Sequence, residues 1–574
     1  MAAALQDFRS SLLTNAPLPK LTTETSAGTP RSAESGESRR LLPRASNGNL
    51  WPNLEVAAMT DERDTLTRRE ALHSLGAIAG ALALAPGCAT DGEVDAEASD
   101  EAFLTESVSP EPLFANIDHV VVVMMENRSF DHYFGSLSLL EGRKDVNGLK
   151  PGMFNLDTAG KKIFPFHKKN FFTIGDIDHE WDANHLQFGK GKNDGFVKAH
   201  ELDLAKLKST GKGVCGRICA DPADPMAFYT RLELPTSYAL ADEYAISDNW
   251  FCSVMGPTWP NRFFLHAGTA NGKQKNAPIW KKEIKTVWDV LKESGLDVKN
   301  FYCDAPWAAG AFLGSSKFGL IANVFEKDEV LFDSFEKRAR DGKLPAFSVI
   351  DPAFNPLADG IGWDDHPPHD ARLGQAFINV IYQMLAKSPK WERTLLLVTY
   401  DEHGSFYDHV PPPLVSDLHA DFRQLGFRVP TMIIGPHIKK RYVSHTLADH
   451  VTVLSTLRKR WPKPIHATWL KWLKSFDELK SPVARVRTTK TVADCFDPAL
   501  LGKPRKPAFL APQVVSESAA MATIGRGNGH PDFKEFLKNK LIPDSLLPGL
   551  ADPKKYLAEF LEVCEKHGAA KIVT

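Results

Sequence analysis

The chain contains little cysteine and almost no net charge. Seven cysteines in 574 residues are too few for a fold built on disulfide bonds. Basic and acidic side chains nearly balance, which leaves a formal net charge of −2. Without a basic field, nucleic acid is not expected as a partner. The chain also lacks a Gly-x-Ser-x-Gly motif, which disfavours a serine lipase of the α/β-hydrolase type.

The few cysteines still allow isolated disulfide bonds. Cys215 and Cys219 are close enough in sequence to pair, and Cys252 could pair with Cys303 across the fold. The spacing of the cysteines matches no zinc ribbon or zinc finger. We therefore expect at most one or two disulfides and no structural zinc.

The N-terminal region is expected to be processed rather than folded. Residues 1–58 are rich in Ser, Thr, Pro, Gly and Arg without periodicity, which predicts disorder. Residues 59–88 are typical of a bacterial twin-arginine export signal. We therefore expect that translation starts at Met59 and that residues 1–58 are not part of the natural protein.

The export signal has three recognisable parts. Arg68 and Arg69 form the arginine pair, Ala71–Leu84 is the apolar core, and Cys88 follows as a candidate lipid anchor. The core is too short to span a bilayer comfortably as a permanent helix. The sequence predicts a periplasmic, secreted or lipid-anchored protein. The alternative is a cytoplasmic chain with a chance apolar helix.

The remainder divides into a linker, a main domain and an extension. Residues 89–114 are acidic and predict a flexible tether. Residues 115–480 are expected to form the catalytic domain, and residues 481–574 a C-terminal extension packed on it.

Apolar segments alternate with helical patterns in the main domain, which is typical of an α/β fold with a mostly parallel central sheet flanked by helices. Residues 148–241 contain few clean strands and predict a cap-like insertion near the substrate. The expected strands are Ile117–Asn127, Leu344–Asp351, Thr394–Tyr400 and Val429–Pro436. The expected helices include Ala371–Ala386, Leu447–Trp461 and Asp552–His567.

Polar side chains follow the expected strand Thr394–Tyr400 directly. They are Asp401, Glu402 and His403, before a turn at Gly404. In open α/β sheets, ligands bind beyond the carboxyl ends of the strands. We therefore expect a functional site here; the alternative is a solvated acidic loop.

Three other segments carry candidate chemistry. Glu126 and Asn127 end the first expected strand, and His366 lies in the proline-rich loop WDDHPPHD. Thr258 lies in GPTWPNRFFLHAG, where prolines on both sides fix the local backbone. Each has an alternative: Thr258 as an ordinary loop hydroxyl, the His366 loop as plain structure, and Asn127 as an N-cap of the following helix.

Convergence of these segments would create a metal site. Glu126, Asp401 and Glu402 cannot all stay ionised at close range without a counter-cation. Carboxylate, amide and imidazole ligands suit a divalent ion such as Mg, Ca, Mn or Zn. Such an ion would lower the pKa of the Thr258 hydroxyl, and His366 could then stabilise charge or protonate a leaving group.

The four motifs together resemble the non-specific phospholipase C family, which includes an acid phosphatase branch. The resemblance runs in order from Ile117 to Trp461. It implies an alkaline-phosphatase-like α/β fold and hydrolysis through a phosphorylated Thr or Ser. The segments that carry it are IDHVVVVMMENRSFDHYFG, GPTWPNRFFLHAG, DDHPPHD and TYDEHGSFYDHVPPP.

The resemblance assigns roles to particular residues. Thr258 corresponds to the nucleophile, and His366 and His179 to phosphate-contacting histidines. Ser405 departs from the Gly that is common in the family at this position. The metal or phosphate cluster corresponds to Glu126, Asn127, Asp401 and Glu402.

The resulting expectation is an exported phosphoric diester hydrolase that releases diacylglycerol and a phosphorylated head group. Its substrate would be a phospholipid or another phosphate ester, and its contact with a membrane surface transient. The alternatives are an acid phosphatase with the same site and a catalytically silent, lipid-anchored binding protein. Aromatic side chains expected near the substrate, where they could hold a choline head group or line a generic pocket, are Trp181, Phe188, Trp259, Trp307 and Trp363.

Overall fold

The computed structural model describes most of the chain after residue 110. The described ranges are 111–171, 175–211, 221–279, 284–304, 306–312, 325–327, 333–354, 361–417, 419–473, 483–486, 489–522 and 552–573. The predictions for the export signal, the linker up to residue 110, Cys88, and the pair Cys215 and Cys219 lie outside these ranges. Within them, no helix is both long enough and apolar enough to cross a membrane.

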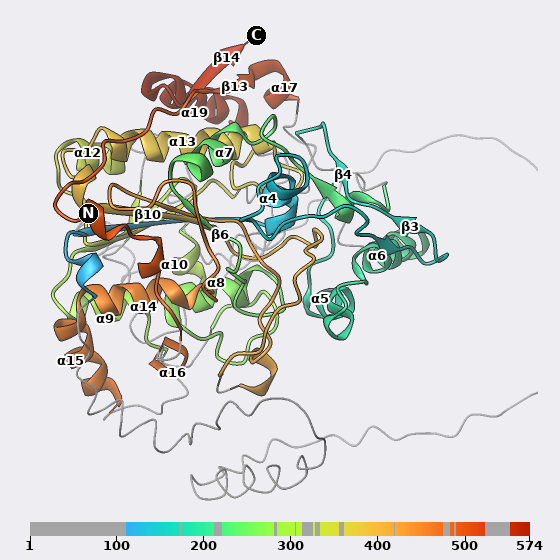
Figure 1. Cartoon of the computed structure of the whole chain (residues 1–574), viewed down its shortest axis with the longest axis horizontal. Helices are drawn as coiled ribbons and strands as arrows, with labels where there is room; N and C mark the ends of the chain where they lie inside the picture. The colour runs from blue at the N-terminus through green and yellow to red at the C-terminus, as the bar shows by residue number, and fades with distance from the viewer. Residues whose placement is uncertain are drawn as a thin grey trace, which may run out of the picture. The chain divides into compact units, whose positions relative to one another are not determined.

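An eight-stranded mixed sheet forms the centre of the molecule (Figure 1). The strand order is β12-β6-β11-β10-β1-β9-β7-β8, and β11 alone runs antiparallel to its neighbours in this sheet. This confirms the predicted α/β class with a mostly parallel sheet. The strands are β1 (His119–Met125), β6 (Ala245–Ser247), β7 (Val298–Tyr302), β8 (Phe325–Lys327), β9 (Phe347–Asp351), β10 (Thr394–Tyr400), β11 (Thr431–Ile434) and β12 (Tyr442–Ser444).

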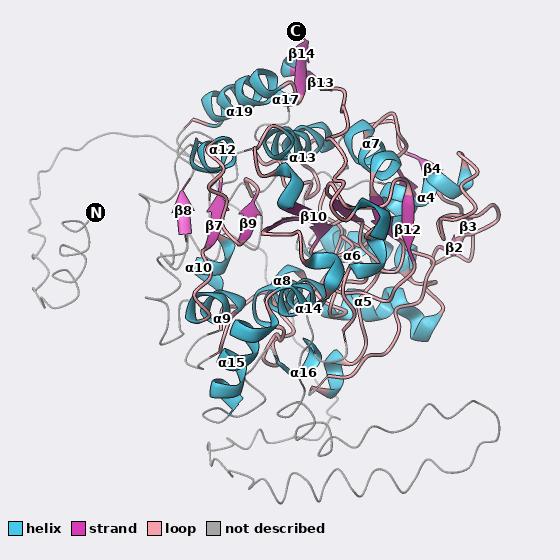
Figure 2. Cartoon of the chain, turned by 60° about the vertical axis from the view of Figure 1, so that its left-hand side comes forward, coloured by secondary structure: helices cyan, strands magenta, loops and turns pink. Residues whose placement is uncertain are grey.

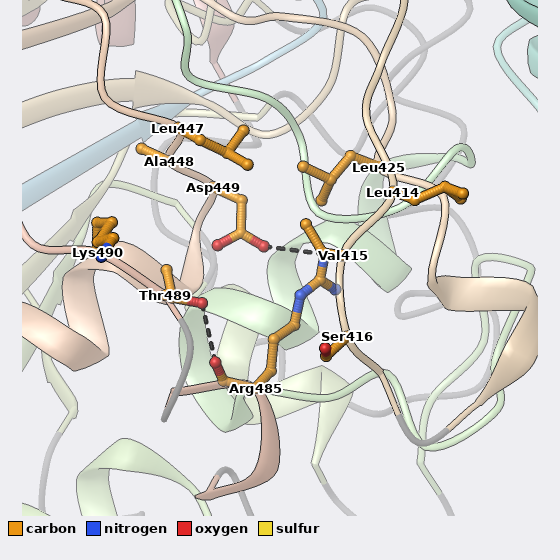
Figure 3. Close-up of a pocket in the computed structure, with 10 residues that line it drawn as sticks. All are labelled: Leu414, Val415, Ser416, Leu425, Leu447, Ala448, Asp449, Arg485, Thr489 and Lys490. Carbon is orange, nitrogen blue, oxygen red and sulfur yellow. Dashed lines mark hydrogen bonds and ion pairs between the residues drawn. The ribbon is translucent and has the colours of Figure 1, made fainter. Parts of the chain in front are cut away.

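Helices cover both faces of the sheet (Figure 2). This explains why β1 and β10 are buried along their whole length and are composed mainly of Val, Leu and Met. On one face lie α7 (Pro235–Glu243), α12 (Asp333–Arg340) and α13 (Ala371–Ala386). On the other lie α8 (Thr258–Ala267), α9 (Val287–Glu293), α14 (Val451–Arg460) and α15 (Pro462–Leu473).

The long periodic segments were predicted best. The bounds of α13 and β10 are the predicted ones, whereas α14 starts at Val451 rather than Leu447. Strands β6 and β12 were not predicted, since three residues are too short to show a period. Helix α8 was also missed, because the prolines around its first turn indicated a loop.

The insertion forms a lobe beside the sheet, at the edge of the molecule in Figure 1. The lobe has a small apolar cluster, separate from the main core, which includes Phe196, Phe228 and Phe427. Its elements are β2 (Asn155–Leu156), β3 (Lys162–Ile163), β4 (Phe166–His167), α5 (Trp181–Phe188), α6 (Phe196–Thr210) and β5 (Ala227–Phe228).

The C-terminal extension contacts the helical layer through α19 (Pro553–His567), which packs on α13. The Asn379 side-chain amide on α13 donates hydrogen bonds to the carbonyls of Ala511 and Ala569, both at 3.1 Å. Strands β13 (Gln513–Ser516) and β14 (Ala570–Val573) pair in parallel.

The proposed disulfide between Cys252 and Cys303 is wrong. Both residues are buried, and neither forms a disulfide. Cys252 lies shortly after β6 and Cys303 directly after β7, and four strands of the sheet separate β6 from β7. At about 4.8 Å between neighbouring strands, the two side chains lie too far apart to bond.

Candidate active site

The register of β1 and β10 brings the first candidate residues together. Met125 and Tyr400 are paired at the ends of these strands. Glu126 and Asp401, the residues that follow them, therefore lie at the same edge of the sheet. The Asp401 N–H donates to the Met125 carbonyl at 3.0 Å. The Glu126 N–H donates to the carbonyl of Asp364 at 2.8 Å, which attaches the WDDHPPHD loop to this edge.

The two turns after these strands interlock. Asn127 has a positive φ of 59°, and its N–H donates to Asp401 Oδ1 at 3.1 Å. Gly404 also has a positive φ of 61°, and a Cβ atom there would lie 2.1 Å from the Asn127 carbonyl oxygen. This position therefore requires glycine.

Asn127 does not cap the following helix. Helix α4 (Phe130–Leu139) is capped by Ser129, whose Oγ accepts the His132 N–H at 3.0 Å. The N-cap interpretation of Asn127 is therefore wrong, because the left-handed turn at Asn127 moves the cap two residues along the chain. Its side chain is instead available to the site.

Thr258 lies at the start of α8 and is fully buried. Its Oγ1 donates to Glu126 Oε2 at 3.5 Å. Asn261 holds the preceding loop in place: its Oδ1 accepts from the Val254 N–H at 2.9 Å, and its Nδ2 donates to the Gly256 carbonyl at 2.9 Å. The hydroxyl is therefore fixed beside a carboxylate at a helix N-terminus.

Arg262 is a site residue that the sequence argument missed. It lies one helical turn after Thr258, and its guanidinium contacts Glu126. It also lies 3.5 Å from Asp401 Oδ2 and 3.9 Å from Asp351 Oδ1. Recognising α8 as a helix would have placed Arg262 and Thr258 on one face, since they are four residues apart.

Arg262 supplies a positive charge among these carboxylates. Burial is the largest effect on Asp401 and raises its pKa well above the usual value; Glu126 raises it further, whereas Arg262 opposes the shift. Burial also raises the pKa of Asp351 to about 6, again with Arg262 acting in the opposite direction. Arg262 thus supplies part of the positive charge that these buried carboxylates require.

The histidines form the second part of the site. The rings of His179 and His366 are 6.0 Å apart between centroids. Asp176 Oδ1 lies 3.3 Å from His179 Nδ1 and 3.8 Å from His366 Nε2. Asp176 was not predicted as a site residue, although it lies only three residues before His179.

Asn127 joins the two parts. Its backbone N–H binds Asp401, while its side-chain Nδ2 lies 3.3 Å from His179 Nε2. His179 Nδ1 is 2.8 Å from the Ile177 carbonyl, which places the proton on Nδ1 and leaves Nε2 to accept from Asn127.

Glu402 faces the histidine part. Its Oε2 accepts from the Gly404 N–H at 2.8 Å, and its Oε1 lies 4.0 Å from His179 Nε2. His403 is held by α5, because its Nε2 lies 2.7 Å from Gln187 Oε1. Burial lowers the pKa of His403, so this residue braces the turn as a neutral ring.

Asp364 and Asp365, the two residues before His366, fix the loop that carries this histidine. Asp364 Oδ1 accepts from the His366 N–H at 3.0 Å and lies 2.5 Å from His369 Nδ1. Asp365 Oδ2 accepts hydrogen bonds from the hydroxyls of Tyr133 at 2.9 Å and Tyr400 at 2.6 Å. This network connects the loop to α4 and β10.

The residue types at the site suit a divalent ion, but the group of ligand atoms found close together does not consist of the predicted ligands. Asn127 Oδ1, Asp401 Oδ2 and Glu402 Oε1 are buried and make no hydrogen bond within the described ranges, and hard oxygen atoms of this kind suit such an ion. A nearby group of possible ligand atoms, all within 4.8 Å of one another, comes from Asp176, His179 and His366. The expected metal ligands are therefore divided: Glu126 and Asp401 contact Arg262, whereas Glu402 faces the histidines.

Three of the tryptophans expected near the substrate belong to the main apolar core. Trp259, Trp307 and Trp363 are fully buried in the main core. Trp259 and Trp307 pack edge to face at 5.9 Å, and the Arg262 guanidinium lies 5.9 Å from the centre of the Trp307 ring. Trp181 is half-buried and lies against Gly256, where an added Cβ would meet its ring at 3.1 Å.

The chain is similar to known proteins across this region. The sequence profile of the Phosphoesterase family matches residues 117–463, more than half of the chain. Non-specific phospholipase C1 of Arabidopsis thaliana is 33% identical over 387 residues, which cover 62% of this chain and 68% of that protein. Phospholipase C B of Mycobacterium tuberculosis is 28% identical over 416 residues, which cover 61% of this chain and 74% of that protein.

Solved structures show more distant likeness. The lipoteichoic acid synthase LtaP from Listeria monocytogenes aligns with a TM-score of 0.33 and 10% identity, over 64% of this chain and 78% of that one. A protein of the alkaline phosphatase superfamily from Vibrio parahaemolyticus aligns with a TM-score of 0.28 and 17% identity, over 40% of this chain and 60% of that one.

Proposed function

The chain belongs to the phosphoesterase family, and from this premise we propose that it is a phospholipase C. It would cleave a phospholipid into diacylglycerol and a phosphorylated head group. The observation that carries the proposal is the position of Thr258, a buried hydroxyl beside Glu126 at the strand edge where Asn127 and Asp401 meet. The similar plant and mycobacterial proteins named phospholipase C support the choice of substrate.

Thr258 is the proposed nucleophile. Its oxygen attacks phosphorus and the bond from phosphorus to the diacylglycerol oxygen breaks, which leaves the head-group phosphate on Thr258. Glu126, whose Oε2 accepts the Thr258 hydrogen bond, is placed to receive the hydroxyl proton. The position of Thr258 at the start of α8 favours the anionic phosphate, because the positive end of the helix dipole lies there.

A histidine would protonate the departing oxygen. His366 Nδ1 lies 2.6 Å from the Pro367 carbonyl, so Nε2 is the atom that can exchange a proton with the substrate. Water then attacks phosphorus and gives a proton back to His366. The bond to Thr258 breaks, the threonine oxygen regains its proton from Glu126, and the phosphorylated head group leaves.

The charged residues hold these groups in position. Arg262 orients Glu126 and Asp401 and balances part of their charge. A divalent ion bound by Asn127, Asp401 and neighbouring carboxylate oxygens would neutralise further charge and polarise the phosphoryl group.

Substitution of Thr258 tests the mechanism. We expect Thr258→Ala to abolish turnover of phosphatidylcholine while the thermal midpoint stays close to that of the natural protein. Thr258→Ser keeps a hydroxyl and should retain measurable turnover. Full activity of the Thr258→Ala variant would exclude Thr258 as the nucleophile.

A substrate panel tests the reaction class. One purified preparation is assayed with phosphatidylcholine, p-nitrophenyl phosphorylcholine and p-nitrophenyl phosphate. Preference for the two diesters supports a phospholipase C. Turnover of the monoester alone would indicate an acid phosphatase. Binding of these compounds without turnover of any of the three would indicate a catalytically silent protein.

We also propose that the protein is exported. The support is the arginine pair Arg68 and Arg69, followed by the apolar segment Ala71–Leu84. Mass spectrometry of the native protein tests this and the expected start at Met59. Detection of tryptic peptides between Leu5 and Arg44 would contradict the start site, and retention of the mature protein in the cytoplasm would contradict export.

A further inference from the structure

The β2–β3 hairpin of the insertion lobe presents phenylalanine to solvent. Phe164 is 50% exposed and Phe154 36% exposed. The two rings contact each other with centroids 5.9 Å apart. Lys162 Nζ lies 4.2 Å from the centre of the Phe154 ring.

The strand register shows that this exposure follows from the hairpin itself. Asn155 is paired with Ile163, so Phe154 and Phe164 occupy the next pair across the strands. Side chains alternate between the two faces of a strand. Asn155 and Ile163 face the lobe, and the phenylalanines therefore occupy the outer face, where polar residues are usual.

Hydrogen bonds and apolar contacts attach the hairpin to the rest of the lobe. Asn155 is buried; its Oδ1 accepts from the Phe196 N–H at 2.9 Å and its Nδ2 donates to the Asn193 carbonyl at 3.1 Å. Ile163 and Met153 pack against the separate apolar cluster of the lobe. The exposed rings thus project from an anchored element.

Four lysines lie in or near the hairpin in the sequence, and one of them, Lys162, lies over the Phe154 ring. Lys150, Lys161, Lys162 and Lys169 are all exposed. The acidic residue of the hairpin, Asp157, is half-buried, and its Oδ1 accepts from the N–H groups of Ala159 and Lys161. A second carboxylate lies at the turn, where Glu201 Oε2 accepts from the Thr158 N–H at 2.6 Å. The four exposed lysines outnumber these two half-buried carboxylates, so the hairpin combines aromatic rings with an excess of positive charge.

We propose that this hairpin docks the protein onto the surface of a bilayer that contains anionic phospholipids. Phenylalanine rings enter the boundary between head groups and acyl chains, and lysines are attracted to anionic head groups. Two rings form too small an area for a stable protein interface, whereas a membrane-binding surface gains from each inserted ring. The choice of a lipid partner rests on the proposed phospholipase function.

Flotation with lipid vesicles tests the docking. The full chain carries Thr258→Ala so that lipid is not consumed, and vesicles contain phosphatidylcholine alone or mixed with phosphatidylglycerol. We expect stronger binding to the mixed vesicles and weaker binding as salt increases. Phe154→Ser combined with Phe164→Ser should reduce the bound fraction roughly 10-fold.

The matched control is Phe509→Ser, which removes an even more exposed phenylalanine, 86% exposed, outside the lobe. This variant should bind vesicles normally. Equal binding by the hairpin variant and the control, or no binding of the parent protein to mixed vesicles, would overturn the proposal.

A soluble substrate separates this inference from the proposed function. In the chain that retains Thr258, the hairpin substitutions should leave turnover of p-nitrophenyl phosphorylcholine unchanged and reduce turnover of vesicle phosphatidylcholine. Loss of both activities would overturn the docking role, because the hairpin would then support the site itself. Hairpin-dependent vesicle binding by a protein with no esterase activity would support docking and refute the phospholipase function.

Discussion

At the scale of single residues, the site depends on how one guanidinium is placed. Arg262 lies among Glu126, Asp351 and Asp401, and all four side chains are fully buried. A buried charge without a partner is strongly destabilising. Arg262 therefore affects both the stability of the fold and the geometry around Thr258.

Replacement of Arg262 should show both effects. We expect Arg262→Met to lower the free energy of unfolding by about 3–5 kcal/mol, because it leaves buried carboxylates uncompensated, and to remove activity. Arg262→Lys keeps the charge but loses the planar fork, so it should lose less stability and still lose most activity. Urea unfolding and phosphodiesterase assays measure the two quantities; an Arg262→Met variant as stable as the parent would contradict this account.

A second residue-scale prediction concerns Asp365 and pH. Burial raises its pKa from 3.8 to about 6, with Arg128 acting in the opposite direction. The folded state therefore holds this proton more tightly than the unfolded state. The resulting stabilisation is fully present below about pH 4, is lost as pH rises towards 6, and amounts to about 3 kcal/mol.

The comparison with Asp365→Asn isolates this effect, since Asn does not titrate. Between pH 4 and 6, approximately the interval between the two pKa values, the unfolding free energy of the variant should fall less steeply than that of the parent. Parallel pH profiles of stability would show that Asp365 does not titrate in this way.

At the scale of elements, the C-terminal helix supports the loop that carries His366. Trp363 in this loop stacks on Phe560 of α19 at 4.1 Å with nearly parallel rings, and Tyr556 lies 4.9 Å from it. The next residue, Asp364, accepts the Glu126 N–H. Helix α19 is thus connected to the site through two successive residues of the loop.

Removal of this stacking should lower kcat more than it changes KM. We expect Phe560→Ala to reduce kcat about 10-fold or more, since small displacements of catalytic groups have effects of this size. Phe560→Tyr keeps the ring and should retain activity. Leu561→Ala, a buried residue on the same helix, is the control for a general loss of packing, and an equal loss of kcat in this variant would refute a specific role of Phe560.

At the scale of the whole molecule, the site joins segments that are far apart in the chain. Glu126 and Asn127 follow β1, Asp176 and His179 belong to the insertion, and Asp401 follows β10. A bound divalent ion would connect these segments through their side chains. Ligand binding to the folded state alone stabilises it.

Removal of metal is therefore expected to affect the whole fold. Chelation with EDTA should lower both activity and the thermal midpoint, and a divalent ion should restore them; metal analysis of the purified protein identifies the ion. In the Asp401→Asn variant, chelation should change both the activity and the thermal midpoint less than in the parent protein. Unchanged activity and midpoint in a protein free of metal would refute the metal assignment.

The parts of the fold that could be predicted were those with local signals. Segments such as Thr394–Tyr400 and Ala371–Ala386 show their period within themselves, so their bounds were found correctly. Arg262 and Asp176 were missed because their importance depends on which carboxylate or imidazole lies opposite, and a single sequence contains no such distance. The place of the tryptophans in the main core could not be predicted for the same reason, because an aromatic ring is equally suited to a core and to a binding surface.

The sequence by itself determined the α/β class and the edge of the sheet where chemistry was expected, because short apolar strands followed by polar residues produce these features locally. Thr258 and His366 were found in proline-rich segments, and their roles came from the family resemblance. Tertiary structure alone decided which of the carboxylates contact Arg262 and which face the histidines. Strand register and the turns at Asn127 and Gly404 place Glu126 and Asp401 against Arg262, and Glu402 towards the histidines. These partnerships arise from contacts between residues more than a hundred positions apart, whose charges can be balanced only after the chain has folded.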